Sequence, residues 1–169
     1  MLMNIQIREA SEADLKVIQQ LAYDIWPETY SPILSQEQIR YMLELFYSLK
    51  ALHTEYHKEG YHFFIMRIGS IDAGYACVER KDAAHWHLHK IYLHQRYQGQ
   101  GIGKKLIQHV EHVASQNGAR YMTLNVNRYN IARYFYEACG YSIIKEDDIP
   151  IGNDFWMNDY IMRKDFTPE

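Results

Sequence analysis

The chain has 169 residues, of which 47% are hydrophobic and 23% are charged, and its net charge is -3 at pH 7. This length suffices for one domain with a substantial core, and the composition is ordinary for a soluble globular protein. The slightly acidic balance argues against a nucleic-acid partner, which would require a basic surface. No basic segment precedes a long apolar run and no 18 apolar residues occur together, so we expect a cytoplasmic protein without a membrane partner.

The first part of the chain predicts one strand and two helices. Alternating isoleucines indicate a strand over residues 4–8. Residues 11–14 suit a helix N-cap, and the helix should stop before Pro27, because the residue before proline avoids the helical region. Residues 26–32 then form a stiff aromatic loop. A capping box over residues 35–38 opens the second helix.

The remaining residues predict most of the sheet and two further helices. The expected elements are a hairpin over residues 61–80 turning near Gly69, a strand over 85–93, a helix from about Gly101 to Asn117, a strand over 121–126, a short helix over 131–138, and strands over 141–145 and 155–162. Pro150 and Gly152 should break the chain between the last two strands. Because we find no repeat and no linker, we expect a single mixed α/β domain over residues 1–169.

The two cysteines give no sign of chemistry. Cys77 and Cys139 lie in different expected elements and lack metal-ligand spacing. We therefore expect both to be buried small hydrophobic residues rather than a disulfide or a nucleophile.

The segment over residues 98–103 carries three glycines in its last five positions, between an expected strand and an expected helix. Glycine lets backbone N–H groups turn toward one point and lets a ligand come close. The helix that follows adds unpaired N–H groups and a partial positive charge. The segment therefore predicts an anion-binding loop, with a phosphate as its natural occupant.

Three phosphate-binding patterns can be compared with this loop. A Walker A loop needs Ser or Thr after Gly-Lys, but Lys105 stands there, and a dinucleotide fingerprint needs G-x-G-x-x-G rather than the G-x-G-x-G found here. The third pattern is Gln/Arg-x-x-Gly-x-Gly/Ala behind an Ile-Tyr-Leu strand end, and Gln98, Gly101 and Gly103 fill it. In this pattern the chain resembles the GNAT family of N-acetyltransferases, whose loop holds the pyrophosphate of acetyl-CoA. A glycine-rich helix start without a ligand is the alternative.

A second segment, over residues 127–141, carries the same resemblance. Family members often show Asn, a small residue, an aromatic pair and then Gly-Phe/Tyr. The matching residues here are Asn130, Ala132, Phe135, Tyr136, Gly140 and Tyr141. Residues 26–30 and 154–162 look most like the bacterial polyamine acetyltransferase branch of the family.

The resemblance implies a GNAT fold, with a mixed, mostly antiparallel sheet of six to seven strands flanked by about four helices. It implies an N-acetyltransferase that uses acetyl-CoA as co-substrate, needs no metal, and acetylates a primary amine of a small polyamine-like molecule or a peptide. A non-catalytic acyl-CoA-binding or sensing domain is the alternative, and Tyr136 argues against it. The sequence leaves open which amine is used and whether subunits pair as a homodimer.

The resemblance also implies roles for single residues. Backbone N–H groups near Ile91, Tyr92 and Leu93, where the strand bulges in the family, would face the thioester carbonyl. Tyr136 would protonate the departing thiolate, with a core aromatic as the alternative, and Asn130 would bind the pantetheine arm, with a helix N-cap as the alternative. The loop residues that would bind the coenzyme are Gln98, Gly99, Gln100, Gly101, Ile102, Gly103 and Lys104.

The general base is sought among His85, His87 and His89, which alternate along one strand and share a face. A histidine with a pKa of about 6.5 is mostly neutral at pH 7, so His87 and His89 are candidates to accept a proton, directly or through water. A metal site is the rival hypothesis, but i, i+2 spacing separates these residues by about 6.6 Å, too far for one ion without bending. A half-exposed polar face is the other alternative.

The acceptor end of the site should carry carboxylates. A lysine-like amine has a pKa of about 10.4 and arrives as an ammonium ion, which an acidic entrance attracts. The candidates are Glu28, Glu79, Glu146, Asp147, Asp148, Asp154 and Asp159. Solvated turns are the alternative for such charged runs.

Overall fold

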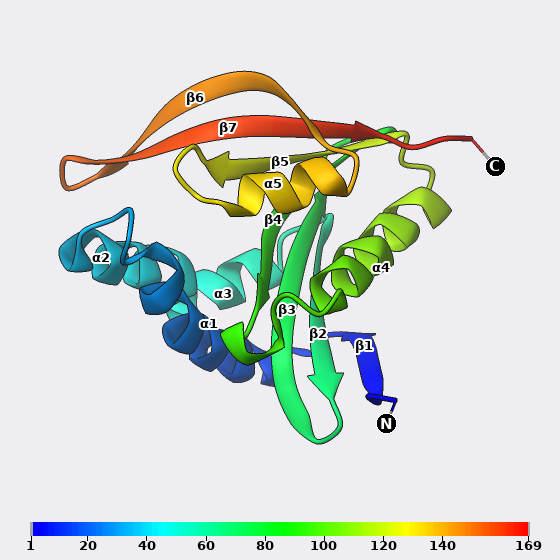
Figure 1. Cartoon of the computed structure of the whole chain (residues 1–169), viewed down its shortest axis with the longest axis horizontal. Helices are drawn as coiled ribbons and strands as arrows, with labels where there is room; N and C mark the ends of the chain where they lie inside the picture. The colour runs from blue at the N-terminus through cyan, green and yellow to red at the C-terminus, as the bar shows by residue number, and fades with distance from the viewer. Residues whose placement is uncertain (1, 169) are drawn as a thin grey trace.

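The computed structural model describes residues 2–168, which form a seven-stranded sheet and five α-helices (Figure 1). The helices are α1 (Leu15–Tyr30), α2 (Gln36–Tyr47), α3 (Leu49–Tyr56), α4 (Ile102–Gln116) and α5 (Ala132–Ala138). The strands are β1 (Ile5–Glu9), β2 (Tyr61–Ile68), β3 (Ile71–Arg80), β4 (His85–Leu93), β5 (Tyr121–Asn127), β6 (Ser142–Gly152) and β7 (Phe155–Asp165). Two short 3-10 turns precede helices, η1 (Glu12–Asp14) before α1 and η2 (Gln95–Tyr97) before α4.

The strand order is β1-β2-β3-β4-β5-β7-β6. Within residues 2–168, only the β4–β5 pair is parallel. The predicted mixed, mostly antiparallel sheet is therefore confirmed. The parallel pairing is short, since it joins residues 85–88 of β4 to residues 121–124 of β5. Beyond this point β5 follows β7 and leaves β4, so the sheet opens into a fork (Figure 1).

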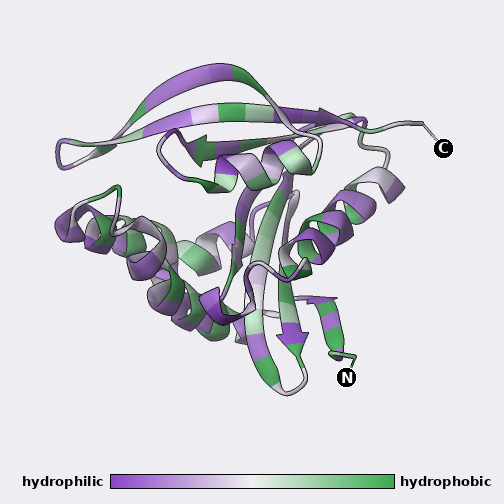
Figure 2. Cartoon of the chain, in the orientation of Figure 1, coloured by the Kyte–Doolittle hydropathy of each residue, from purple (hydrophilic) through white to green (hydrophobic). Residues whose placement is uncertain are grey.

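Each face of the sheet has its own hydrophobic core. On one face α4 buries Leu106, Ile107 and Val110 against strands β2 to β5, and Figure 2 shows green and purple residues alternating around this helix. On the other face, helices α1 to α3 pack over residues such as Ile65 and Tyr75. The helix that the apolar spacing predicted in this segment is therefore confirmed as α4.

The predicted end of α1 before Pro27 is wrong, because the helix continues through this proline to Tyr30. Proline removes one helical hydrogen bond and crowds the preceding turn. The carbonyl left without this hydrogen bond is that of Tyr23, four residues earlier, and Tyr23 lies on the exposed side of the helix, where water can serve it. Burial of the flanking residues then outweighs the local preference, so the expected aromatic loop is the last turns of a helix.

Two further expectations need correction. The chain between α2 and β2 holds a third helix, α3, whose N-cap Ser48 accepts the backbone N–H of Ala51. Pro150 does not break the chain but lies inside β6, at the edge of the sheet. An edge strand tolerates proline because its outer N–H groups have no partner strand.

The cysteines are free thiols in the described part of the chain. Cys77 is buried, as predicted, whereas Cys139 is only half-buried. No helix within residues 2–168 has the length and apolar character that crossing a membrane requires.

Candidate active site

A cavity of about 1230 Å³ lies along the fork between β4 and β5. Helix α1, strand β7, the end of β4, helix α5 and the glycine loop before α4 all contribute to its walls. The cavity therefore joins the α4 side of the molecule to the region covered by α1 to α3.

The glycine loop leaves its backbone open to this cavity. Gly99 and Gly101 both have a left-handed backbone, with φ of 74° and 75°, and an added Cβ at either would meet no atom within 4 Å. Gly101 is the N-cap of α4, and Gly103 and Lys104 line the cavity beside it. Unpaired N–H groups and the positive end of the helix dipole fit this end of the cavity to an anion.

The other loop residues support the loop in different ways. The Gln98 side chain donates a hydrogen bond to the carbonyl of Leu93 (2.9 Å) and so ties the loop to the end of β4. Gln100 reaches back to the carbonyl of Arg96 (3.2 Å) and lies outside the cavity wall. Ile102 is buried in the core, so its backbone alone is available to a ligand.

Ile91, Tyr92 and Leu93 line the cavity at the fork. The N–H of His94 donates to the carbonyl of Ala73 on the β3 side (2.8 Å). Because N–H directions alternate along an antiparallel ladder, those of Ile91 and Leu93 point away from β3, toward the space that β5 has left. The N–H of Tyr92 is directed to β3.

A β-bulge interrupts β4 before this point. The register shift between Cys77 and Val78 leaves His89 without a partner on β3. As a result Leu88 and Ile91, three residues apart, both pack on the core beneath α4. The resemblance placed the bulge near residues 91–93, whereas the structure has it at His89, just before them.

Two of the three histidines of β4 share one partner, and the third has another. Nε2 of His85 and Nδ1 of His87 both contact the hydroxyl of Thr123 at 2.6 Å, and Nε2 of His89 contacts Glu79 at 2.6 Å. His87 and His89 line the cavity, whereas His85 does not. Among the residues that the structure describes, these rings do not converge as a three-ligand metal cluster.

Burial makes both cavity histidines neutral. It lowers the pKa of His87 to about 3, with the neighbouring His89 ring as the next cause. Burial also lowers the pKa of His89, although the hydrogen bond with Glu79 acts in the opposite direction. Both rings are therefore unprotonated at neutral pH, and the hydrogen bond with the Glu79 carboxylate favours the protonated form of His89, a bond that His87 lacks.

Tyr136 projects from α5 into the cavity wall and is nearly buried. Burial raises the pKa of its hydroxyl well above the ordinary value, and the nearby Tyr30 adds to this effect. Asn130 also lines the cavity, while its Oδ1 accepts the backbone N–H of Ala132 (2.9 Å) at the start of α5. The N-cap of α5 is Ile131, so Asn130 is not the N-cap that was its alternative; it makes an Asx-type contact one residue earlier, which does not use its amide N–H groups.

The structure separates the candidate carboxylates. Glu28 and Asp159 line the cavity. Those that pair with basic groups or lie in turns elsewhere are Glu79 with His89 and Lys81, Glu146 and Asp148 with Arg128, Asp147 with Lys145, and Asp154 in the β6–β7 turn. Only two of the predicted acidic residues thus reach the described cavity.

Asp159 has the most unusual environment of these acids. It is only 5% exposed, and its Oδ2 accepts a hydrogen bond from the side chain of Asn125 (3.2 Å). Burial raises the pKa of Asp159, against the effect of this hydrogen bond. A buried carboxylate with a neutral partner is stabilised when a cation comes to it.

Sequence reasoning missed a second buried charge in the wall. Lys90 donates to both carboxylate oxygens of Glu55, at 2.9 and 3.1 Å, and its Nζ lies 5.2 Å from the Tyr47 ring centre. Glu55 comes from α3, which was not predicted, and no local pattern links two residues 35 positions apart. Only long-range contact brings this pair together.

Several tyrosines also gather behind the cavity. The hydroxyls of Tyr30 and Tyr92 are 2.7 Å apart, and Tyr75 donates to Tyr47 at 2.8 Å. Burial raises the pKa of all four, that of Tyr30 to about 12. The many tyrosines of this chain therefore serve, in part, as a rigid and uncharged wall.

Comparisons with known proteins agree with this geometry. Residues 30–157 match the family model of the acetyltransferase (GNAT) domain. Over 159 residues the chain is 29% identical to a spermidine N(1)-acetyltransferase of Thermoplasma acidophilum, covering 92% of this chain and 96% of that protein. It is 31% identical to a 5-NmdU N-acetyltransferase of Pseudomonas phage PaMx11, covering 84% and 90%.

A solved structure gives the same result. The PaiA N-acetyltransferase of Thermoplasma acidophilum, in complex with coenzyme A, superimposes with a TM-score of 0.85 at 26% identity. The match covers 97% of this chain and all of that one. An open glycine loop at the start of α4, a forked sheet and a family match over most of the chain lead to one conclusion. This protein belongs to the GNAT family and is an acetyl-CoA-dependent N-acetyltransferase.

Proposed function

We propose that this enzyme transfers the acetyl group of acetyl-CoA directly to a primary amine of a small, polyamine-like molecule. The observation that carries the proposal is the single cavity that joins the glycine loop to the buried carboxylate of Asp159. The similarity to a spermidine N(1)-acetyltransferase supports the same class of acceptor.

The coenzyme would occupy the glycine-loop end of the cavity. The open backbone of Gly99 and Gly101, the start of α4 and the charge of Lys104 suit a pyrophosphate. Extended from there, the pantetheine arm would run along the free edge of β4 and past the Asn130 amide. The outward N–H groups of Ile91 and Leu93 are the donors that would polarise the thioester carbonyl.

The acceptor would occupy the end lined by Glu28 and Asp159. A polyamine carries several ammonium groups at neutral pH, and only the reacting one must lose its proton. A second ammonium group beside Asp159 would receive a charged partner and relieve the cost of burying that carboxylate. Glu28, exposed on α1, would attract the substrate at the entrance.

The chemistry would need three protein groups. The amine nitrogen attacks the thioester carbon, the C–S bond breaks, and the amide keeps the acetyl group. The thiolate takes the proton of the Tyr136 hydroxyl, which its raised pKa keeps protonated at neutral pH. The proton lost by the amine goes to a base and then to solvent, and the Tyr136 phenolate takes a proton back from solvent.

His89 is the base that we favour, with His87 as the second candidate. Both are neutral and reach the cavity, but a pKa of about 3 makes His87 a weak acceptor. His89 is held through Nε2 by the Glu79 carboxylate, which stabilises a protonated ring and leaves Nδ1 free for the substrate or a water.

The test is acetyl-CoA turnover against a panel of polyamines, amino acids, aminoglycosides and lysine peptides. Turnover is measured as the rate at which the coenzyme thiol is released. We expect the highest kcat/KM with spermidine-like amines. A clear preference for a peptide or an aminoglycoside would contradict the acceptor assignment. Silence across the panel, with coenzyme A still bound, would favour the acyl-CoA-sensing alternative.

A further inference from the structure

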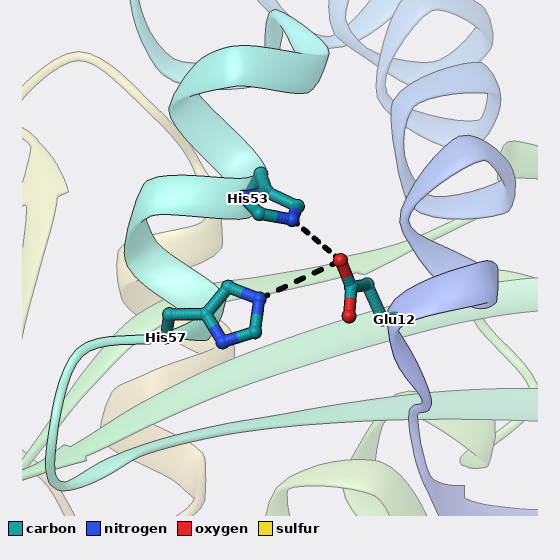
Figure 3. Close-up of side chains that lie close together, drawn as sticks. All are labelled: Glu12, His53 and His57. Carbon is teal, nitrogen blue, oxygen red and sulfur yellow. Dashed lines mark hydrogen bonds and ion pairs between the residues drawn. The ribbon is translucent and has the colours of Figure 1, made fainter.

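Three side chains with metal-binding atoms meet on the surface, outside the cavity. His53 lies in α3, His57 directly follows this helix, and Glu12 lies in η1. Figure 3 shows both rings turned toward the carboxylate. Oε1 of Glu12 lies 2.5 Å from Nε2 of His53 and 3.5 Å from Nε2 of His57. Two chain segments separated by 41 positions thus bring metal-binding nitrogen and oxygen atoms close together.

The arrangement suits a small cation. His53 and His57 are four residues apart, which puts them on one face of helical backbone, and their ring centres are 4.5 Å apart. One donor atom from each of the three residues lies within 4.8 Å of the others. Tetrahedral zinc holds its donors at about 2.0–2.2 Å, and therefore roughly 3.3 Å from one another. Small rotations of the exposed side chains would bring the three ligand atoms to this spacing.

We propose that Glu12, His53 and His57 form a binding site for a divalent first-row transition metal, with Zn²⁺ as the reference ion. Two imidazole nitrogens and one carboxylate oxygen are a donor set that zinc uses in proteins. The same set disfavours Mg²⁺ and Ca²⁺, which prefer oxygen ligands alone. The side chains are 53%, 55% and 52% exposed, so a water molecule can complete the coordination.

The site would join α3 to the start of α1. Helix α3 also carries Glu55, whose ion pair with Lys90 forms part of the cavity wall. A bound ion would therefore stabilise the folded state and this wall without entering the reaction. A simple hydrogen-bonded cluster, in which Glu12 holds the two rings without any ion, is the competing explanation.

The experiment titrates the metal-free, tag-free full chain with Zn²⁺ alone by calorimetry. We expect one saturable site and, at a hundredfold excess over Kd, a rise in Tm of roughly 5 to 10 °C. His53→Gln and His57→Gln should each weaken binding by more than the roughly 10- to 100-fold that loss of an outer-shell partner costs. The double variant should lose the site.

Two further variants make the result specific. Glu12→Gln keeps a hydrogen-bond acceptor beside both rings but removes the charged ligand, so zinc affinity should fall while the metal-free Tm changes little. His112→Gln removes an exposed histidine of α4 and should bind zinc like the unaltered protein. Turnover should be unchanged in all of these variants.

Three outcomes would overturn the proposal. They are a zinc stoichiometry far below one, equal zinc affinity in the double variant and the unaltered protein, or an equal rise in Tm with Mg²⁺. Because all three positions are exposed, the variants should fold, and circular dichroism checks this.

Discussion

The two ends of the cavity are built by different means. At the end that we propose for the coenzyme (the coenzyme end), lined by Gly99, Gly101 and Gly103, the backbone of one short loop faces the cavity. At the end that we propose for the amine (the acceptor end), side chains such as Glu28 and Asp159 come from elements that lie far apart in the chain. Binding of a ligand by backbone therefore depends on local conformation, whereas the affinity for a ligand held by side chains can change with single substitutions.

Tyr136 lies between the two ends and should show the largest effect. Its neighbour Phe135 lies near Gly103, and Tyr136 itself is close to Tyr30 of α1. Tyr136→Phe keeps the ring and removes the proton donor, so kcat should fall by about 10²- to 10⁴-fold, roughly 3 to 5 kcal/mol of barrier. Coenzyme affinity and Tm should change little. If the variant turns over at the original rate, under conditions in which the chemical step is rate-limiting, the assigned role is wrong.

A substitution at Asp159 tests the acceptor end alone. Asp159→Asn removes a buried charge, so KM for spermidine should rise by about 10- to 100-fold, as expected for a charged hydrogen bond worth 1.5–3 kcal/mol. The coenzyme Kd should not change. Asp154→Asn, the same change in the exposed turn of the same hairpin, is the control. Equal KM values for the two variants would argue that no ammonium group binds at Asp159.

A substitution at Gly101 tests the coenzyme end alone. Gly101→Val puts a branched side chain beside the open backbone, so the coenzyme Kd should rise by about tenfold or more, which is 1.4 kcal/mol. Gly69→Val in the β2–β3 turn is matched, because that glycine also has a positive φ (62°) and open space. The strain is therefore similar in both variants. A Kd within a factor of about two of the Gly69→Val value would contradict the anion cradle.

The pH dependence of stability probes the wall between the ends. His87 has a pKa of about 3 when folded and about 6.5 when unfolded, so between these values only the unfolded chain binds the proton. Stability is therefore lost as pH falls from 6.5 toward 3. Between pH 7 and pH 5, this one group should account for about 2 kcal/mol.

His87→Gln should remove this acid-dependent loss, whatever it does to stability at pH 7. Denaturant melts at pH 7 and pH 5 would measure the difference, with His112→Gln as the control for removing an exposed histidine. An unchanged difference in the His87→Gln protein would mean that the ring is protonated in the folded state.

Chelation should have the smallest effect on turnover. The proposed reaction uses backbone N–H groups and a phenol where a Lewis acid would otherwise serve. A strong chelator should therefore leave kcat unchanged, even if it lowers Tm by emptying the Glu12–His53–His57 site. Loss of activity that zinc restores would instead revive a metal role for the histidines of β4.

The backbone conformation of the proposed coenzyme end was predictable because the sequence patterns that determine it are local. The apolar alternation of β4, the three glycines and the spacing of α4 lie within one stretch of about 30 residues. Each pattern reports backbone conformation directly, so a strand, an open loop and a helix start follow from it.

The acceptor end was only partly predictable, and the helices over it show why. Proline normally ends a helix, yet α1 continues past Pro27, since the packing of its buried face outweighs the local cost. Helix α3, which carries His53 and Glu55 and is directly followed by His57, was not predicted.

By itself the sequence determined the element types around the glycine loop, the family pattern and a set of seven candidate acids. Tertiary structure alone decided that Asp159 is buried in the cavity, that Glu55 pairs with Lys90, and that Glu12 meets two histidines. Hydrophobic periodicity in the sequence indicates the secondary structure of a segment and the face that it buries, because both are local properties. Which distant segment meets that face depends on how the helices and strands pack.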